Sequence, residues 1–204
     1  MPTIIPTKGN LIATKRSLSL ARLGYELMDR KRNILVREMM SMIETAKELQ
    51  SKIDVTFSQA YAALQAANIT LGICEQIAMT VPEDESFQVR FRSVMGVEVP
   101  SVVINEPERR NVYYGFSNTN SMLDEAYIKF TEVKHFTASL AEVENSIYRL
   151  AIAIKKTQKR ANALKNIIIP NFIGNVKSIT DALEEKDREE FVRLKVIKAQ
   201  KDKL

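Results

Sequence analysis

A seven-residue repeat of apolar side chains through residues 133–168 constrains the fold more than any other feature of the sequence. One row of the repeat consists of Val133, Leu140, Ile147, Ile154, Ala161 and Ile168. A second row beside it consists of Phe136, Val143, Leu150, Thr157 and Leu164. Two rows sustained over about five heptads are typical of a left-handed coiled coil. One helix cannot bury such a seam alone, so a second helix has to cover it.

The second helix is predicted at the other end of the chain, from Leu11 to about Ile77. Its two rows are Leu11, Leu18, Tyr25, Arg32, Met39, Ala46, Ile53, Ala60, Ala67 and Cys74, and Thr14, Ala21, Met28, Leu35, Met42, Leu49, Thr56 and Ala63. A further apolar stripe of Leu20, Leu27 and Ile34 suggests contact with more than one neighbour. Thr7 and Asn10 are both candidates for the helix N-cap.

A change of period separates the two helices. Pro82 and the acidic run after it end the first helix. Apolar residues then alternate over 87–92 and 97–99, and Met95 with Gly96 supplies a turn, which predicts a β-hairpin. Pro100 restricts the second strand to an edge, with residues 102–104 continuing it beyond a bend. Ser117, Thr119 or Ser121 is expected to cap the next helix, and Ser121 with Asp124 resembles a capping box.

These elements predict a mainly α fold, a long antiparallel two-helix coiled coil of the N- and C-terminal helices with a small mid-chain β-hairpin. The expected segments are residues 1–80 for the first helix, 81–120 for the hairpin and loop, and 121–204 for the second helix. A kink or short break is expected near Pro170. Beyond it the seam resumes as Phe172, Val176, Ile179 and Leu183, then Phe191, Leu194 and Ile197.

The composition excludes several other classes of protein. The 204 residues include only 6 Gly and 6 Pro, which favours long helices. Cys74 is the only cysteine, so no intrachain disulfide can form, and a reducing compartment is expected. We find no signal peptide and no apolar run near 18 residues, so direct membrane insertion is not expected.

Positive charge is concentrated at the two ends of the chain. Residues 1–40 carry net +5 and residues 157–204 net +4, whereas residues 41–156 carry net −4. Antiparallel helices bring the two ends together, which predicts one strongly basic surface. Its candidate residues are Lys8, Lys15, Arg16, Arg22, Arg30, Arg32, Arg193, Lys195 and Lys198. We expect this surface to face an acidic partner; without glycines or interleaved aromatic residues, nucleic acid is not the expected partner.

No catalytic, cofactor or metal motif is present. The sequence lacks the phosphate-binding loop, the dinucleotide fingerprint, paired cysteines and the zinc-protease motif. The lone His135 is interpreted as a surface or packing residue, and Cys74 as a small buried apolar one. Residues 83–85 are interpreted as a solvated acidic turn rather than a cation site. The clusters at 155–160 and 184–190 are interpreted as exposed helix faces, the latter with oppositely charged residues at helical spacing.

Two sets of sequence motifs at the chain ends carry a family resemblance. The first comprises Pro6 to Leu11, Lys15 to Leu18 and Gly24 to Arg32; the second comprises Thr157 to Leu164, Ile169 with Pro170, and Glu189 to Lys195. In their order and spacing they resemble the D subunit of the V-type and A-type rotary ATPases. The middle of the chain matches that family in layout more than in motifs.

The resemblance implies a non-catalytic central rotor shaft that transmits torque between an ATP-hydrolysing or ATP-synthesising head and an ion-translocating membrane ring. The implied partners are the catalytic head subunits A and B, which form a hexamer, the F subunit, and a funnel-shaped C or d subunit on the ring. The implied location is cytoplasmic and peripheral to the membrane. Nucleotide and ion sites belong to other subunits, so no cofactor is expected here.

The mid-chain hairpin is a family feature too, implicated in tuning the ATPase rate. We therefore expect it to be regulatory or partner-binding rather than structural. The residues concerned are Phe87, Val89, Phe91, Met95, Gly96, Val97 and Val99. The alternative for the whole chain is a free-standing coiled-coil adaptor that binds an acidic partner. Coupling to a nucleotide-hydrolysing head distinguishes the two, because an adaptor would show none.

Overall fold

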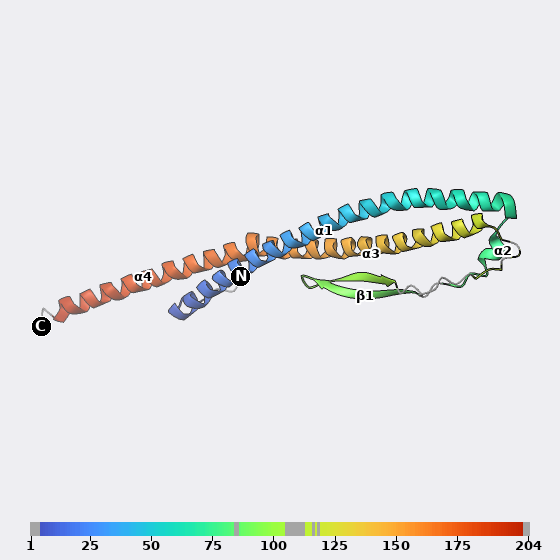
Figure 1. Cartoon of the computed structure of the whole chain (residues 1–204). Coiled ribbons are helices and arrows are strands. Elements are labelled where there is room, and N and C mark those ends of the chain that lie inside the picture. Colours follow the sequence, from blue (N-terminus) through green and yellow to red (C-terminus); the bar gives the residue numbers. More distant parts are fainter. Residues whose placement is uncertain (1–4, 84–85, 105–112, 116, 118, 202–204) are drawn as a thin grey trace. The chain divides into compact units, whose positions relative to one another are not determined.

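Two long helical stretches flank a small hairpin in the computed structural model, which describes residues 5–83, 86–104, 113–115, 117 and 119–201 (Figure 1). The elements are α1 (Lys8–Leu71), α2 (Glu75–Ala78), β1 (Phe87–Val94), β2 (Val97–Ile104), α3 (Ser121–Ala163), a π-helical turn (Leu164–Ile168) and α4 (Ile169–Lys201). The mainly α class, the long helices at both ends and the two-stranded antiparallel hairpin are confirmed. The chain divides into two compact units, residues 34–154 and the remainder.

In the unit of residues 34–154, α1 and α3 pack antiparallel along the predicted seams. Leu35 and Leu150 are fully buried in one cluster. Further along, the Tyr61 ring meets the Phe130 ring edge-on at 5.5 Å between centroids. Moving along α1 from Leu35 to Tyr61, the contacts on α3 move back from Leu150 to Phe130, as antiparallel pairing requires. Seam residues Ile53, Ala60, Ala67 and Val133 are likewise buried.

In the other unit, the start of α1 packs against the end of α3 and the start of α4. The buried residues here are small or short: Thr14, Ala21, Thr157, Ala161 and Ile179. Arg32 Nη1 donates a hydrogen bond of 2.9 Å to Gln158 Oε1 across the helices. Its other guanidinium nitrogen lies 2.7 Å from the Asp29 carboxylate, so Arg32 ties its own helix to the opposite one.

Two helix boundaries differ from the sequence prediction. The expectation of an unbroken first helix to about Ile77 is wrong, because α1 ends at Leu71. Gly72 follows with φ of 80°, a left-handed conformation that terminates helices and that glycine adopts without penalty. Helix α3 is capped not by Ser117, Thr119 or Ser121 but by Asn120, whose Oδ1 accepts the Leu123 N–H at 3.0 Å. At the other end of the chain Thr7 is the cap, accepting the Asn10 N–H at 3.2 Å.

The chain does not break near Pro170. A π-helical turn precedes α4, and the helix continues through the proline. Proline has no N–H to donate and its ring crowds the carbonyl four residues earlier, and a widened turn relieves both problems. The extra residue rotates the seam, so Ile168 is exposed and the prediction that it is a seam residue is wrong. The seam resumes as predicted, with Ile179 buried, but Phe191, Leu194 and Ile197 are exposed.

The hairpin closes through a two-residue turn. Met95 and Gly96 have φ of 51° and 75°, the positive values of the tight turn that matches the strand twist. The register pairs Val94 with Val97 and Phe87 with Ile104. Pro100 lies inside an unbroken β2, so no bend separates residues 102–104.

Truncating the fully buried Leu150 tests the seam. Leu150→Ala is expected to lower the free energy of unfolding by about 2–5 kcal/mol, because it leaves a cavity beside Leu35. The control Ile152→Ala, on the exposed side of the same helix, is expected to change it by about 0.5 kcal/mol or less. Urea denaturation followed by circular dichroism measures both, and equal losses would contradict the seam assignment.

Removing the Arg32 guanidinium tests the other unit. Arg32→Ala is expected to cost about 1–2 kcal/mol of unfolding free energy, because bonds to Gln158 and Asp29 disappear together. The neighbouring exposed Arg30→Ala is the matched control, with an expected change of about 0.5 kcal/mol or less. The same denaturation measurement applies, and a silent Arg32→Ala would contradict the cross-helix role.

Candidate partner-binding surfaces

All nine predicted basic residues fall in the unit that contains the two ends of the chain. Eight of them are exposed: Lys8, Lys15, Arg16, Arg22, Arg30, Arg193, Lys195 and Lys198. The exception is Arg32, which is half-buried, bonded to Gln158 across the helices and paired with Asp29 on its own helix. Its charge therefore contributes to packing as well as to any basic surface.

The exposed cations have only weak partners within this unit. Lys8 lies 3.9 Å from Asp187 and Arg193 lies 3.7 Å from Glu189, and these exposed pairs contribute little to stability. Lys195 stacks over the Phe191 ring at 4.8 Å. Among the described residues, Lys15 and Arg16 have no ion pair. These side chains are thus available to a partner's carboxylates.

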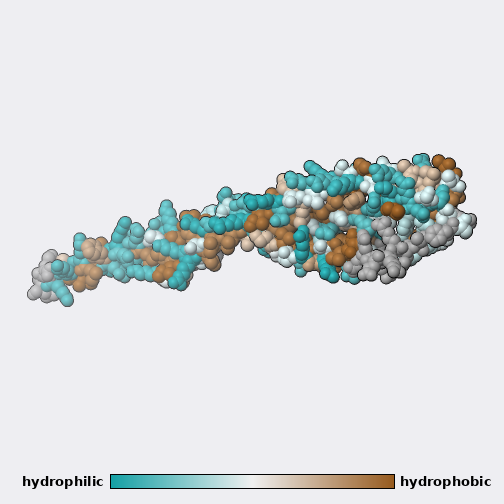
Figure 2. Space-filling view, viewed as in Figure 1, coloured by the Kyte–Doolittle hydropathy of each residue, from teal (hydrophilic) through white to brown (hydrophobic). Residues whose placement is uncertain are grey.

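Large apolar side chains are exposed between these cations. Along α4, hydrophobic and hydrophilic patches alternate on the surface (Figure 2). The most exposed include Leu20 at 72% and Leu194 at 64%, and every described residue from 184 onward is exposed. The stripe of Leu20, Leu27 and Ile34 is also exposed. Such mixed apolar and basic surfaces are typical of protein contacts rather than of a solvated helix face.

The hairpin is held against α3 by its second strand. Three α3 side chains, one on each successive turn, bond the backbone of β2. Glu142 accepts the Val102 N–H at 2.7 Å, the Ser146 hydroxyl donates to the Pro100 carbonyl at 3.5 Å, and Arg149 donates to the Glu98 carbonyl at 3.2 Å. Alternate residues of β2 thus meet successive turns of α3, because the spacings along the two elements are similar.

The seven hairpin residues predicted from the sequence divide into two groups. Val99 is fully buried with Leu35 and Leu150, so the hairpin also contributes to packing. Val97 and Phe87 are half-buried, and Phe87 lies beneath the Lys134 ammonium. The exposed group consists of Val89, Phe91, Met95 and Gly96.

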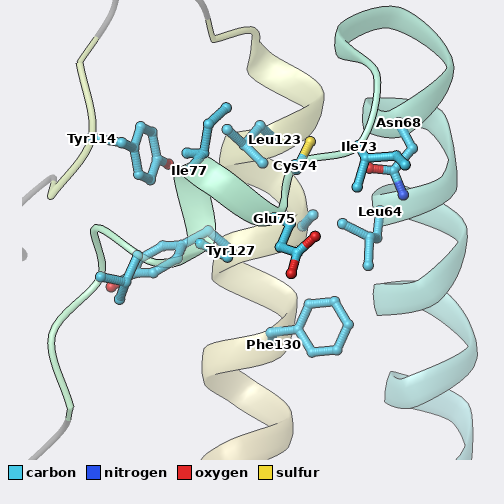
Figure 3. Close-up of a pocket in the computed structure, with 13 residues that line it drawn as sticks. Leu64, Asn68, Ile73, Cys74, Glu75, Ile77, Tyr114, Leu123, Tyr127 and Phe130 are labelled. Carbon is cyan, nitrogen blue, oxygen red and sulfur yellow. The ribbon is translucent and has the colours of Figure 1, made fainter.

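An apolar pocket of about 490 Å³ lies where α1 ends, beside α2 and the start of α3 (Figure 3). Its walls include Leu64, Ile77, Leu123 and Phe130, and Ile73 stands at its side. Ile69, Ile73 and Met79 are more than three-quarters exposed at this end of the unit. The pocket is lined by apolar surface with few polar groups. It is therefore better suited to hold an apolar side chain of another protein than to serve as a catalytic site.

Polar contacts brace the start of α3 beside this pocket. The Tyr114 hydroxyl donates to Asp124 at 2.6 Å, and Asn120 Nδ2 donates to the Thr70 hydroxyl at 2.6 Å, which joins α3 to the last turn of α1. Burial raises the pKa of the Tyr114 phenol well above its ordinary value, and the bond to Asp124 acts in the same direction. The phenol therefore stays a proton donor at neutral pH.

The residues weighed for catalysis show packing contacts. Cys74 is buried beside Ala67 and Leu123, as predicted for a small apolar residue. His135 is half-buried, 6.1 Å from the Phe87 ring. Of the acidic run 83–85, two residues lie outside the described part. No cluster of His, Cys, Asp or Glu that could hold a metal occurs among the described residues.

Within the described ranges, no helix is long and apolar enough to cross a membrane.

Sequence reasoning missed the α3 residues that hold the hairpin and the pocket beside α2. Glu142, Ser146 and Arg149 share one helix face at i, i+4 and i+7, but their polarity made that face look solvated. The pocket combines residues from three elements, and no local pattern predicts it.

Comparison with known proteins gives matches that extend over nearly the whole chain, including both ends. The family model for the D subunit of ATP synthase matches residues 10–199. The V-type ATP synthase D subunit of Thermotoga neapolitana is 46% identical over 96% of this chain and 97% of its own length. The A-type ATP synthase D subunits of Pyrococcus furiosus and Pyrococcus abyssi are 37% and 36% identical, each over 98% of this chain and 96% of their own length. The chain belongs to the D-subunit family of V-type and A-type ATP synthases.

Proposed function

We propose that this chain is the central rotor shaft of a V/A-type ATP synthase. The observation that carries the proposal is the pair of long antiparallel helices, packed along their predicted seams within each unit, in a chain of the D-subunit family. A shaft has to transmit torque along its length. Helices with internally bonded backbones and a buried common seam resist bending and twisting better than single helices do.

In this proposal the chain performs no catalysis itself. ATP hydrolysis or synthesis takes place on head subunits A and B, and ion translocation on the membrane ring. The shaft lies in the cytoplasm, peripheral to the membrane. Its role is mechanical coupling, which requires surfaces for partners rather than a reaction site.

The basic surface at the chain ends is proposed to face the head hexamer. Lys15, Arg16 and Arg22 are exposed cations near exposed apolar side chains such as Leu20 and Leu23. Attraction between distributed charges is long-ranged and tolerates changes of register. A shaft that turns inside a ring needs that tolerance, because it meets each face of the ring in succession.

The other unit supplies the proposed contacts with the F subunit and with the funnel-shaped C or d subunit. The exposed β1 residues of the hairpin are the proposed regulatory or F-binding surface. The exposed Ile69, Ile73 and Met79 beside the apolar pocket fit the funnel-shaped partner, because such side chains gain from being covered by another protein.

Co-expression tests the proposal as a whole. We expect the chain to co-purify with subunits A, B and F at one copy per hexamer and to change the rate of ATP hydrolysis. A chain that elutes alone and leaves hydrolysis unchanged would identify a free-standing adaptor instead.

Charge reversal tests the head-facing surface. Lys15→Glu, Arg16→Glu and Arg22→Glu together are expected to weaken incorporation into the head at least tenfold at low salt, because attraction becomes repulsion. The matched control reverses three exposed cations of the other unit, Arg37, Lys47 and Lys52. Size-exclusion titration of the head measures both triple variants. Equal incorporation of the two would place the head contact elsewhere.

A further inference from the structure

The two edges of the hairpin have different surroundings. The edge of β2 faces α3 and is bonded to Glu142, Ser146 and Arg149. A two-stranded sheet has only one other edge, the outer side of β1. The exposure of the strands follows this division, since Gln88 to Ser93 are all exposed while β2 contains the buried Val99 and Pro100.

The register identifies which backbone groups lie along the outer edge of β1. In an antiparallel pair, residues whose backbone groups point away from the partner strand lie opposite residues that do the same. The backbone groups that bond α3 belong to Glu98, Pro100 and Val102. In the register these three residues are paired with Ser93, Phe91 and Val89. The N–H and C=O groups of these three β1 residues therefore point outward, and no other described residue bonds them.

Nothing in the backbone of strand β1 blocks edge pairing. Over eight residues it contains no proline, no glycine and no bulge. An unpaired edge of this length is a template for another strand. On β2 the corresponding outward positions are occupied by α3, so the fold protects one edge and leaves the other open.

We propose that the outer edge of β1 is a strand-docking site for an extended segment of another protein subunit, in which acidic and apolar residues alternate. The inference rests on the proposed function, because that subunit belongs to the same ATP synthase. Arg90 and Arg92 lie on one face of β1, exposed and without an ion pair among the described residues. Val89 and Phe91, about 60% exposed, lie on the other. An added strand would place acidic side chains beside the arginines and apolar ones beside Val89 and Phe91.

The same charges disfavour a second copy of this chain as the occupant. Antiparallel pairing of β1 with another β1 would bring Arg90 and Arg92 beside the same residues of the second copy. Like charges on neighbouring strands are destabilising. A strand from a different subunit, bearing carboxylates at alternate positions, has no such conflict.

Residue-resolved hydrogen exchange of the full chain, free and in the complex with subunits A, B and F, tests the proposal. The amides of Val89, Phe91 and Ser93 are expected to exchange quickly in the free chain and at least tenfold more slowly in the complex. Those of Arg90 and Arg92 bond β2 and should be protected in both. This alternation distinguishes strand pairing from general burial, which would slow all five.

A proline variant gives a second readout. Val89→Pro removes an outward N–H and is tolerated at an edge, as Pro100 is on β2. It is expected to weaken retention of the strand-bearing subunit at least tenfold relative to the reference variant Val89→Thr, which also alters the side chain but keeps the N–H, so that the difference between the two variants reports the lost backbone bond. Protected Arg90 and Arg92 amides in the free variant confirm that its hairpin is formed; if they are lost, the wild-type exchange pattern decides alone.

The contrary outcomes separate the two proposals. Normal incorporation without slowed exchange at Val89 and Phe91 would overturn strand docking and leave the rotor function standing. Slowed exchange that depends on the concentration of the free chain would identify a second copy as occupant and overturn the proposal. Failure of the wild-type chain to incorporate would overturn both.

Discussion

Burial of the heptad seams is the constraint on which the rest of the structure depends. A helix as long as α1 or α3 exposes an apolar stripe that only another long helix can cover, and antiparallel pairing places such a helix beside each one. In one unit the seam contains Leu35 and Leu150, whereas in the other it is built from threonine, alanine and Ile179. Small residues let the helices approach closely, and Arg32 with Gln158 adds a polar link.

The hairpin depends on the same helices but is held in a different way. Val99 joins the cluster of Leu35 and Leu150. Glu142, Ser146 and Arg149 bond the backbone of β2 on the side where a third strand would otherwise pair with it. These hydrogen bonds to backbone groups hold the sheet with its β2 edge against α3, so that the β1 edge faces outward. One set of contacts therefore both anchors the hairpin and presents its free edge.

The chemistry of the exposed surfaces agrees with a protein that functions through its partners. The unit with the chain ends combines exposed cations with apolar side chains, and the other unit carries exposed apolar residues beside a pocket. Membership of the D-subunit family implies that these surfaces have partner subunits within an ATP synthase complex. Surfaces that combine charged and apolar residues suit contacts that are strong in total and that tolerate changes of register.

The sequence by itself determined the helical class, the antiparallel pairing, the hairpin and most seam residues before Ile168, because these follow from local periodicity, from Pro82 and from the turn at Met95 and Gly96. It located the basic ends as well, although whether they face the head stays a prediction. Tertiary structure decided the helix end at Gly72, the Asn120 cap, the π-helical turn before Pro170, the pocket, and the bonding of β2 to α3. Each of these depends on backbone geometry or on side chains from distant segments, and a polar helix face such as that of Glu142 and Arg149 looks solvated until a strand is found against it.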